Sequence, residues 1–228
     1  HHHARPPGAR SVSGRARFGP RAQASPFGGT DMAADKIVQA FRSVQNDEGV
    51  AAVIFRIDSP GGSPAASETI RRAVMETRRK GKPVVVSMSG SAASGGYWIA
   101  ADADKIVAQP GTLTGSIGVF GGKFFMGALW DKLGVNWDAV SEGENARMWS
   151  SNQKFTPAQM QRFESLMAET YEAFLDRVAA GRNIPRDEVK KIAEGRVYTG
   201  RQALEVGLVD DLGGIESLQG IVLDLRNN

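Results

Sequence analysis

The chain has 228 residues, of which 41% are apolar and 23% charged, as in an ordinary soluble globular domain, and its formal net charge is +3. It contains no cysteine, and its three histidines, His1–His3, resemble the remnant of a purification tag. This composition excludes disulfides, a His/Cys metal site, and a Ser-His-Asp triad or cysteine nucleophile within the chain, and no apolar run approaches the about 18 residues of a membrane span.

The first 29 residues differ in composition from the rest of the chain. After the histidines, residues 4–29 are dominated by glycine, proline, arginine and alanine, which is typical of a flexible basic segment. A nucleic-acid surface would interleave basic with aromatic residues, so we expect no nucleic-acid partner. We interpret residues 30–228 as one domain.

From residue 30 onward, apolar strands alternate with amphipathic helices. In chain order we expect helix 30–47, strand 50–58, helix 65–80, strand 83–90, helix 97–104, strand 105–110, a loop and strand within 111–122, helix 124–134, strand 135–140, and helices 157–180, 185–194 and 200–206. Such alternation is typical of right-handed βαβ units. The expected fold class is therefore α/β, with a mostly parallel sheet and a helical C-terminal portion.

Two of the predicted strand-to-helix turns are rich in glycine, namely Pro60-Gly61-Gly62 and Ser94-Gly95-Gly96. In an open parallel sheet, ligands bind at the carboxyl ends of the strands, and glycines there leave backbone N–H groups accessible. Two such turns on neighbouring strands would each supply one N–H to a developing oxyanion, as acyl transfer requires. Simple tight turns are the alternative interpretation.

Ser94 stands between two alanines and two glycines, at the predicted start of a helix. Two interpretations are open: a nucleophile whose small neighbours let an extended peptide approach, or an N-cap serine. Without a histidine, the base for a nucleophilic serine would be a lysine with a lowered pKa. Lys123 and Lys154 lie in glycine-rich or irregular segments and are the candidates, although a lysine is ordinarily a surface residue.

Three long stretches resemble one known family. They are FRIDSPGGSPAASETI (55–70), KPVVVSMSGSAASGGYWIAADADKIVAQPGTLTGSIGVFG (82–121) and VYTGRQALEVGLVDDLGG (197–214). They are similar to the bacterial signal peptide peptidase A family, or protease IV, whose members are serine–lysine peptidases. The similarity extends over residues 30–215. It implies a caseinolytic-protease/crotonase-like βαβ spiral.

The resemblance also implies roles for particular residues. Ser94 takes the position of the nucleophile, and Gly95 with Gly61 or Gly62 takes the positions of the oxyanion hole. Ser116 matches a serine that, in the family, hydrogen-bonds the base lysine. Residues 198–200, Tyr-Thr-Gly, match a structural signature that precedes the C-terminal helices.

The position of the family's base lysine departs from the pattern. Short family members carry this lysine in a segment of the form S-G-x-x-K, and Ala146 stands at the corresponding place here. Three explanations are open: an engineered lysine-to-alanine change, a pseudo-enzyme, or the C-terminal half of a long two-repeat member whose N-terminal half carries the lysine. We favour the last, because the sequence around Ala146 differs from a short-form site and residues 4–19 make a poor first strand.

The resemblance further implies an environment and partners. The substrates would be cleaved signal peptides, held by an apolar pocket for which Val84–Val86, Phe120, Phe124 and Met126 are candidates. The protein would form a ring-like homo-oligomer, anchored in the inner membrane of the bacterial envelope by a segment absent from this chain, with its catalytic domain outside the cytoplasm. No cofactor and no metal are expected.

Two other classes of function compete with the peptidase. A crotonase-like acyl-CoA enzyme would use the same pair of N–H groups but requires a carboxylate base, and neither glycine turn contains a glutamate. A catalytically inactive homologue would bind peptides or partner subunits without turnover, and Ala146 is compatible with it.

Overall fold

The computed structural model describes residues 9–15, 18–19 and 32–218 and divides the chain into two compact units. The first unit comprises residues 1–118 and 173–228, and the second comprises residues 119–172. The strands are β1 (Ala9–Arg15), β2 (Phe18–Gly19), β3 (Met32–Ala33), β4 (Ala52–Ser59), β5 (Val84–Ala93), β6 (Lys105–Ala108), β7 (Leu113–Gly115), β8 (Val197–Thr199) and β9 (Asp211–Leu212). The helices are α1 (Ala34–Gln45), α2 (Pro64–Arg79), α3 (Gly95–Ala100), α4 (Gly127–Leu133), α5 (Pro157–Arg182), α6 (Arg186–Ile192), α7 (Gly200–Glu205) and the 3-10 turn η1 (Ile215–Ser217).

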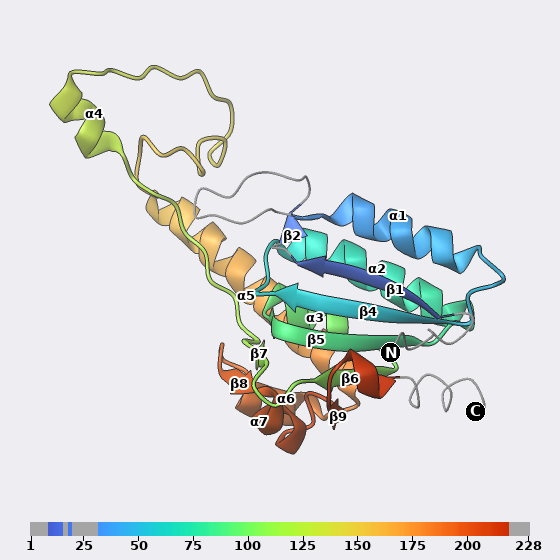
Figure 1. The fold of residues 1–228 in the computed structure, drawn as a ribbon. Helices are drawn as coiled ribbons and strands as arrows, with labels where there is room; N and C mark the ends of the chain where they lie inside the picture. The colour runs from blue at the N-terminus through green and yellow to red at the C-terminus, as the bar shows by residue number, and fades with distance from the viewer. Residues whose placement is uncertain (1–8, 16–17, 20–31, 219–228) are drawn as a thin grey trace. The chain divides into compact units, whose positions relative to one another are not determined.

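The main sheet of the first unit is almost entirely parallel. Its strands follow the order β1-β4-β5-β6-β9, with β7 paired to β5 and β8 paired antiparallel to β7. Helices α1, α2 and α3 pack along the strands β1, β4 and β5 (Figure 1). The α/β prediction is confirmed, and the curled, mostly parallel sheet is that of a caseinolytic-protease/crotonase-like fold.

The core forms where the strands are apolar on both faces and the helices present one apolar stripe. Val84–Val86 of β5 are fully buried, as expected for a central parallel strand. Phe41 of α1 meets Phe55 of β4 edge to face, with ring centroids 5.1 Å apart. Each such buried side chain contributes about 1.5–3 kcal/mol relative to an exposed one, so the central strands hold the glycine turns at their ends on a rigid base.

A register shift curls the sheet close to Ser94. Ile57 of β4 pairs with Met88 of β5, but two residues later Ser59 pairs with Ala92, so β5 carries two extra residues in this interval. The first part of β5 then pairs with β6 and its last three residues pair with β7. The irregularity therefore directs the end of β5 away from β6 and toward β7.

The N-terminal segment differs from two expectations, that of a flexible arm and that residues 4–19 make a poor first strand; the second was one of the two grounds for favouring the two-repeat explanation. The structure places Ala9–Arg15 in strand β1, parallel to β4 and in continuous register from Ala9↔Ala52 to Arg15↔Asp58. Strand pairing uses backbone hydrogen bonds at the open edge of β4, and residue composition carries little information about them. The remaining parts of that expectation, residues 1–8, 16–17 and 20–29, lie outside the described residues.

The second unit contains α4 and the first part of α5. The strand predicted at 135–140 is wrong: these residues are described and form no strand, and Val135, Trp137 and Val140 are exposed. An apolar run becomes a strand only when a neighbouring strand accepts its hydrogen bonds, and the sheet assignments within the described residues include no partner for it. Trp137 instead packs edge to face on Trp130 of α4, with ring centroids 5.7 Å apart.

The helices of the C-terminal portion are confirmed close to their predicted bounds. The later part of α5 buries Phe174, Leu175 and Val178 in the first unit. Helix α7 begins at a capping box, in which Thr199 and Gln202 each accept from the other's backbone N–H. Among the described residues, no helix combines the length and the apolarity needed to cross a bilayer.

Candidate active site

Ser94 occupies a strained backbone position between β5 and α3. Its φ and ψ are 51° and −120°, which non-glycine residues rarely adopt. Its N–H donates to the carbonyl of Gly115 across 2.9 Å, and its own carbonyl accepts from the N–H groups of Tyr97 and Trp98. Ser94 stands at the N-cap position of α3, as one interpretation expected, but its side chain makes no cap hydrogen bond with the helix. The backbone of this half-buried residue is thus fixed by hydrogen bonds that do not involve its side chain.

The turn after β4 lies directly against the Ser94 turn. Gly61 has a φ of 117°, and its N–H donates to the hydroxyl of Ser59 across 3.1 Å. A Cβ at Gly61 would lie 2.8 Å from the nitrogen of Gly95 and 2.9 Å from the Cβ of Ser94. The two glycine-rich turns predicted from the sequence therefore do come together, and only a residue without a side chain fits at this contact.

Gly95 closes the same contact from the other side. A Cβ there would lie 3.0 Å from the nitrogen of Gly62 and 2.5 Å from the hydroxyl oxygen of Ser67. Gly95 is the first residue of α3, where the helix itself supplies no acceptor for the backbone N–H. The Gly62 nitrogen therefore lies beside Gly95, so backbone N–H groups of the two glycine-rich turns come close together.

Ser116 reaches the same edge of the sheet through strand pairing. Ala93 of β5 pairs with Gly115 of β7, so Ser94 and Ser116 each follow directly on a paired residue. Ser116 is half-buried and has a φ of 50°, and its N–H donates to the carbonyl of Arg196 across 2.7 Å. Both serines of the sequence prediction thus stand at strand ends with left-handed backbone conformations.

The lysines of the first unit have structural or surface positions in the described residues. Lys82 donates to the carbonyls of Val44 and Asp47, both across 2.6 Å, and so joins the end of α1 to the start of β5. Lys191 forms an exposed ion pair with Glu188. Within the described part of this unit, no lysine is hydrogen-bonded to the Ser94 hydroxyl.

The two candidate lysines and Ala146 belong to the second unit. Lys123 donates to the carbonyl of Met148 across 2.7 Å and lies 4.3 Å from the ring centroid of Phe155, and desolvation lowers the pKa of its amine. Lys154 lies 5.6 Å from the ring centroid of Phe125. Ala146 is exposed in a turn, where its N–H donates to the carbonyl of Gly143. No proton acceptor exists on the side chain at position 146.

The structure contradicts part of the apolar substrate pocket that was expected from the sequence. Val84–Val86 have no exposed surface, because they lie in the centre of the sheet, and they are unable to line a pocket open to substrate. Phe120 and Phe124 are exposed side chains of the second unit. In the described residues, no group of three or more histidine, cysteine, aspartate or glutamate side chains is arranged to hold a metal ion.

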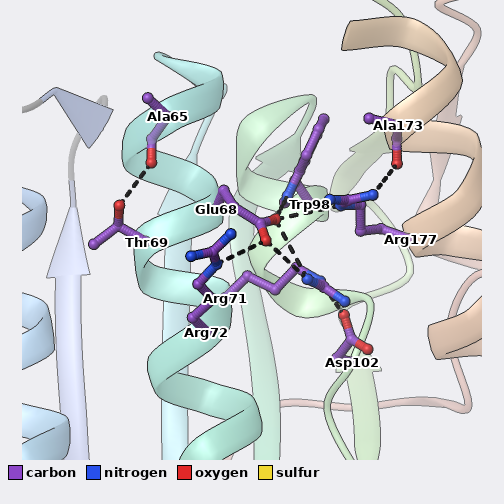
Figure 2. A network of polar contacts seen from close by, with 9 residues as sticks. All are labelled: Ala65, Glu68, Thr69, Arg71, Arg72, Trp98, Asp102, Ala173 and Arg177. Carbon is purple, nitrogen blue, oxygen red and sulfur yellow. Dashed lines mark hydrogen bonds and ion pairs between the residues drawn. The ribbon is translucent and has the colours of Figure 1, made fainter. Parts of the chain in front are cut away.

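Three residues that were not predicted from the sequence lie beside the glycine turns. Ser67 of α2 is fully buried with its hydroxyl unpartnered within the described structure, and a Cβ at Gly95 would touch it. Glu68, the next residue, accepts a hydrogen bond from the indole of Trp98 across 3.0 Å (Figure 2). A glutamate in an amphipathic helix ordinarily faces solvent, so periodicity alone offers no signal for this contact.

Comparison with known proteins points to one group. Residues 76–225 match peptidase family S49, a range that contains Ser94, Ser116 and Ala146. The chloroplastic serine protease SPPA of Arabidopsis thaliana is 38% identical over 200 residues, which cover 87% of this chain and 29% of that protein. Protease 4 of Salmonella typhi is 42% identical over 182 residues, which cover 80% of this chain and 29% of that protein.

In a shorter relative, the matched residues make up a larger share of the protein. A protein of Enterococcus faecium, whose name assigns it provisionally to the signal peptide peptidases as SppA, is 36% identical over 172 residues. These residues cover 75% of this chain and 50% of that protein. The chain therefore spans less than a third of the length of the longer relatives and half the length of this one.

Proposed function

Since the chain belongs to peptidase family S49, we propose that it carries the nucleophile of a serine peptidase and that this nucleophile is Ser94. One observation carries the assignment. Ser94, whose backbone is strained and whose side chain makes no cap hydrogen bond, stands where the turns of Gly61-Gly62 and Gly95 meet. A serine without a structural role for its side chain, adjacent to accessible backbone N–H groups, is the arrangement that acyl transfer requires.

The reaction follows from these positions. The Ser94 oxygen attacks the carbonyl carbon of the scissile peptide bond while a base removes the hydroxyl proton. The N–H of Gly95, together with that of Gly62, stabilises the oxyanion of the tetrahedral intermediate, because the N–H of Gly61 already donates to the hydroxyl of Ser59. The C–N bond then breaks, the leaving amine takes the proton, and water later hydrolyses the acyl-enzyme to free Ser94.

The base of this reaction is proposed to be a lysine from outside this chain. Ala146 has no titratable group, and the chain spans only 29% of the longer relatives, so those proteins contain further sequence that can supply an amine. The resemblance assigns this amine to a preceding homologous half, with Ser116 as its hydrogen-bond partner. The half-buried Ser116, one residue beyond the Ala93–Gly115 pair, is compatible with that role.

The biological setting is proposed from the relatives. One relative is named as a signal peptide peptidase, which supports cleaved signal peptides as substrates in the bacterial envelope. The second unit exposes large apolar side chains, which would be covered in a ring-like homo-oligomer; they include Phe120, Phe124, Leu133, Trp137, Val140 and Trp149. Anchoring to the inner membrane, with the catalytic domain outside the cytoplasm, completes this proposal.

Labelling with a fluorophosphonate probe, which reacts with activated serines, tests the assignment. The full-length protein should be labelled, the Ser94→Ala variant should not, and Ser151→Ala, which alters an exposed serine of the second unit, should react like the wild type. This chain by itself should react far more slowly than the full-length protein. Labelling that survives Ser94→Ala would refute the nucleophile, and full reactivity of this chain alone would place the base within it.

A second candidate is a catalytically inactive peptide-binding homologue, favoured by the alanine at position 146. It predicts that the full-length protein binds peptides without cleaving them and that the probe leaves Ser94 unlabelled. The acyl-CoA alternative has no comparable support, because the family that the chain matches is a peptidase family.

A further inference from the structure

The carboxylate of Glu68 joins three helices of the first unit. It accepts a hydrogen bond from the indole N–H of Trp98 in α3 across 3.0 Å and pairs with Arg177 of α5 at 3.4 Å (Figure 2). Within its own helix α2 it pairs with Arg71 at 3.2 Å and with Arg72 at 3.1 Å. The side chain of Glu68 is only 19% exposed, so these contacts are made largely away from water.

Glu68 and Trp98 each lie one helical turn from a glycine-rich turn of the candidate site. Helix α2 begins at Pro64, directly after Gly62 and the N-cap Ser63, so Glu68 is in its second turn. Trp98 is four residues after Ser94, and its backbone N–H donates to the Ser94 carbonyl across 2.9 Å. A displacement of either side chain is therefore transmitted to one of the two turns through a single turn of helix.

Trp98 has little freedom to move independently of this contact. It is 5% exposed, its ring packs on Phe174 with centroids 4.7 Å apart, and the guanidinium of Arg177 lies 5.7 Å from the ring. Arg71, which also contacts Glu68, forms a buried ion pair with Asp102 just beyond the end of α3. The α2–α3 contact is thus held at Trp98 and again at Asp102.

We propose that Glu68 is a positioning residue, which holds Trp98 and thereby sets the distance between the Gly61-Gly62 turn and the N–H of Gly95. This inference rests on the proposed peptidase function and deepens it. Glu68 touches no reacting atom; it acts through α3. An oxyanion hole works only if its two N–H groups keep a fixed separation, and a displacement of about 1 Å can cost about a hundredfold in rate.

The charges around Glu68 maintain the contact at neutral pH. Desolvation by itself would raise the pKa of the carboxyl, but the Trp98 hydrogen bond and the Arg72, Arg71 and Arg177 guanidinium groups together hold it below its usual value. Asp102, the other acidic group in the network, faces Arg71. The carboxylate therefore remains charged, and able to accept from Trp98, throughout the neutral range.

Three variants of the full-length protein test the proposal. Trp98→Phe removes the N–H donor but keeps an aromatic ring against Phe174. Glu68→Ala removes the acceptor, whereas Glu68→Gln retains an acceptor oxygen without the charge. Arg79→Gln is the matched control, because Arg79 is an arginine of the same helix that is 67% exposed and pairs with Glu76.

The readout is the saturating rate of Ser94 acylation by a fluorophosphonate probe, separated from the probe's apparent binding constant. For Trp98→Phe and Glu68→Ala we expect the saturating rate per folded molecule to fall about tenfold or more, with the binding constant little changed. Glu68→Gln should react faster than Glu68→Ala but more slowly than the wild type, and Arg79→Gln should retain the wild-type rate. A merely structural role would lower the folded fraction but leave the rate per folded molecule unchanged.

An NMR measurement distinguishes a failure of the positioning role of Glu68 from a failure of the peptidase assignment of Ser94. The Trp98 indole N–H resonance, identified by its loss in Trp98→Phe, should shift in Glu68→Gln and should titrate with the carboxylate. If the wild type shows no Ser94-dependent labelling, the peptidase assignment fails whatever the resonance does. If labelling is intact but Trp98→Phe and Glu68→Ala react at the wild-type rate, the positioning role is refuted. It is also refuted if the chemical shift of the Trp98 indole N–H is the same in Glu68→Gln as in the wild type.

Discussion

A Cβ at Gly61 would lie 2.8 Å from the backbone nitrogen of Gly95, although the two residues belong to turns that follow different strands. This contact brings the end of β4 to the start of α3 and leaves no room for a side chain between them. The stability of the first unit and the geometry of the candidate oxyanion hole therefore depend on the same glycines.

Gly61→Ala should destabilise the protein strongly. Position 61 combines a φ of 117° with backbone atoms of Ala93 and Gly95 within 3.0 Å of the added methyl group. We expect the free energy of unfolding to fall by about 2–4 kcal/mol, measured by urea denaturation.

Gly81→Ala is the matched control for this change. Gly81 also has a positive φ, 76°, but nothing lies within 4 Å of an added Cβ. It should lose only about 1 kcal/mol, the cost of the backbone conformation alone. Equal losses at the two positions would contradict the close contact between the glycine turns.

The strained backbone at Ser94 should lower the free energy of unfolding of the wild-type protein. Its φ of 51° and ψ of −120° strain any residue except glycine. We therefore expect Ser94→Gly to unfold with a free energy about 1 kcal/mol higher than Ser94→Ala, although glycine is normally the less stable choice. Both variants lack the hydroxyl, so the comparison isolates the backbone. If Ser94→Ala proves the more stable of the two, the strained conformation at this position is wrong.

Gly95→Ala should depend on the residue at position 67. The added methyl group would lie 2.5 Å from the hydroxyl oxygen of Ser67, which is buried and unpartnered in the described structure. Ser67→Ala alone should be neutral or slightly stabilising, because it removes a polar atom without a partner. Combined with Gly95→Ala it should recover about 0.5–2 kcal/mol of the loss, as measured by a double-mutant cycle in urea.

Ser87→Ala is the control for this cycle. Ser87 is also fully buried with an unpartnered hydroxyl in the described structure, but it pairs with Val107 in the middle of the sheet. Its combination with Gly95→Ala should be additive. A coupling energy as large as that of Ser67 would mean that the effect is general to the core.

Glu68 should make the acid sensitivity of folding steeper. Its pKa in the folded state is held below the usual 4.5, by the Trp98 hydrogen bond and three arginines acting against desolvation, so the folded state favours the charged carboxylate. Its stabilising contribution is therefore present above pH 4.5 and is lost as the pH falls through the folded pKa. Urea denaturation at successive pH values should show Glu68→Gln less stable than the wild type near neutrality, with a difference that narrows below pH 4.5.

Glu76→Gln is the control for this titration. Glu76 lies on the same helix, but its side chain is 48% exposed and pairs only with Arg79 among the ion pairs of the described residues. Its curve measures what the loss of one negative charge from α2 does by itself. A difference between wild type and Glu68→Gln that stays constant at every pH would contradict the lowered pKa.

Elements of this fold were predictable where the signal is local, and were not where a pairing partner decides the outcome. Strands such as 50–58 and 83–90 were predictable because an unbroken apolar run is stable only when it is buried on both faces. Residues 135–140 also carry several apolar side chains, interrupted by Asn136 and Asp138, yet they form no strand. Conversely, Ala9–Arg15 lacked the apolar pattern but pairs along β4. In both cases the decisive factor was whether a neighbouring backbone was available, and no local pattern contains that information.

The sequence by itself determined the alternation of apolar strands and helices from residue 50 to residue 110 and the two glycine-rich turns. It also contains no cysteine and no histidine beyond His1–His3, which leaves lysine as the candidate base for Ser94. These follow from residue chemistry and from periodicity over a few residues. Only the tertiary structure decided that Gly61 meets Gly95, that Ser94 has a strained backbone and makes no side-chain cap hydrogen bond, and that Glu68 accepts a hydrogen bond from Trp98. The partners in these contacts lie some 30 residues apart in the chain, and they meet only because the buried strands between them fix where the turns and helices must lie.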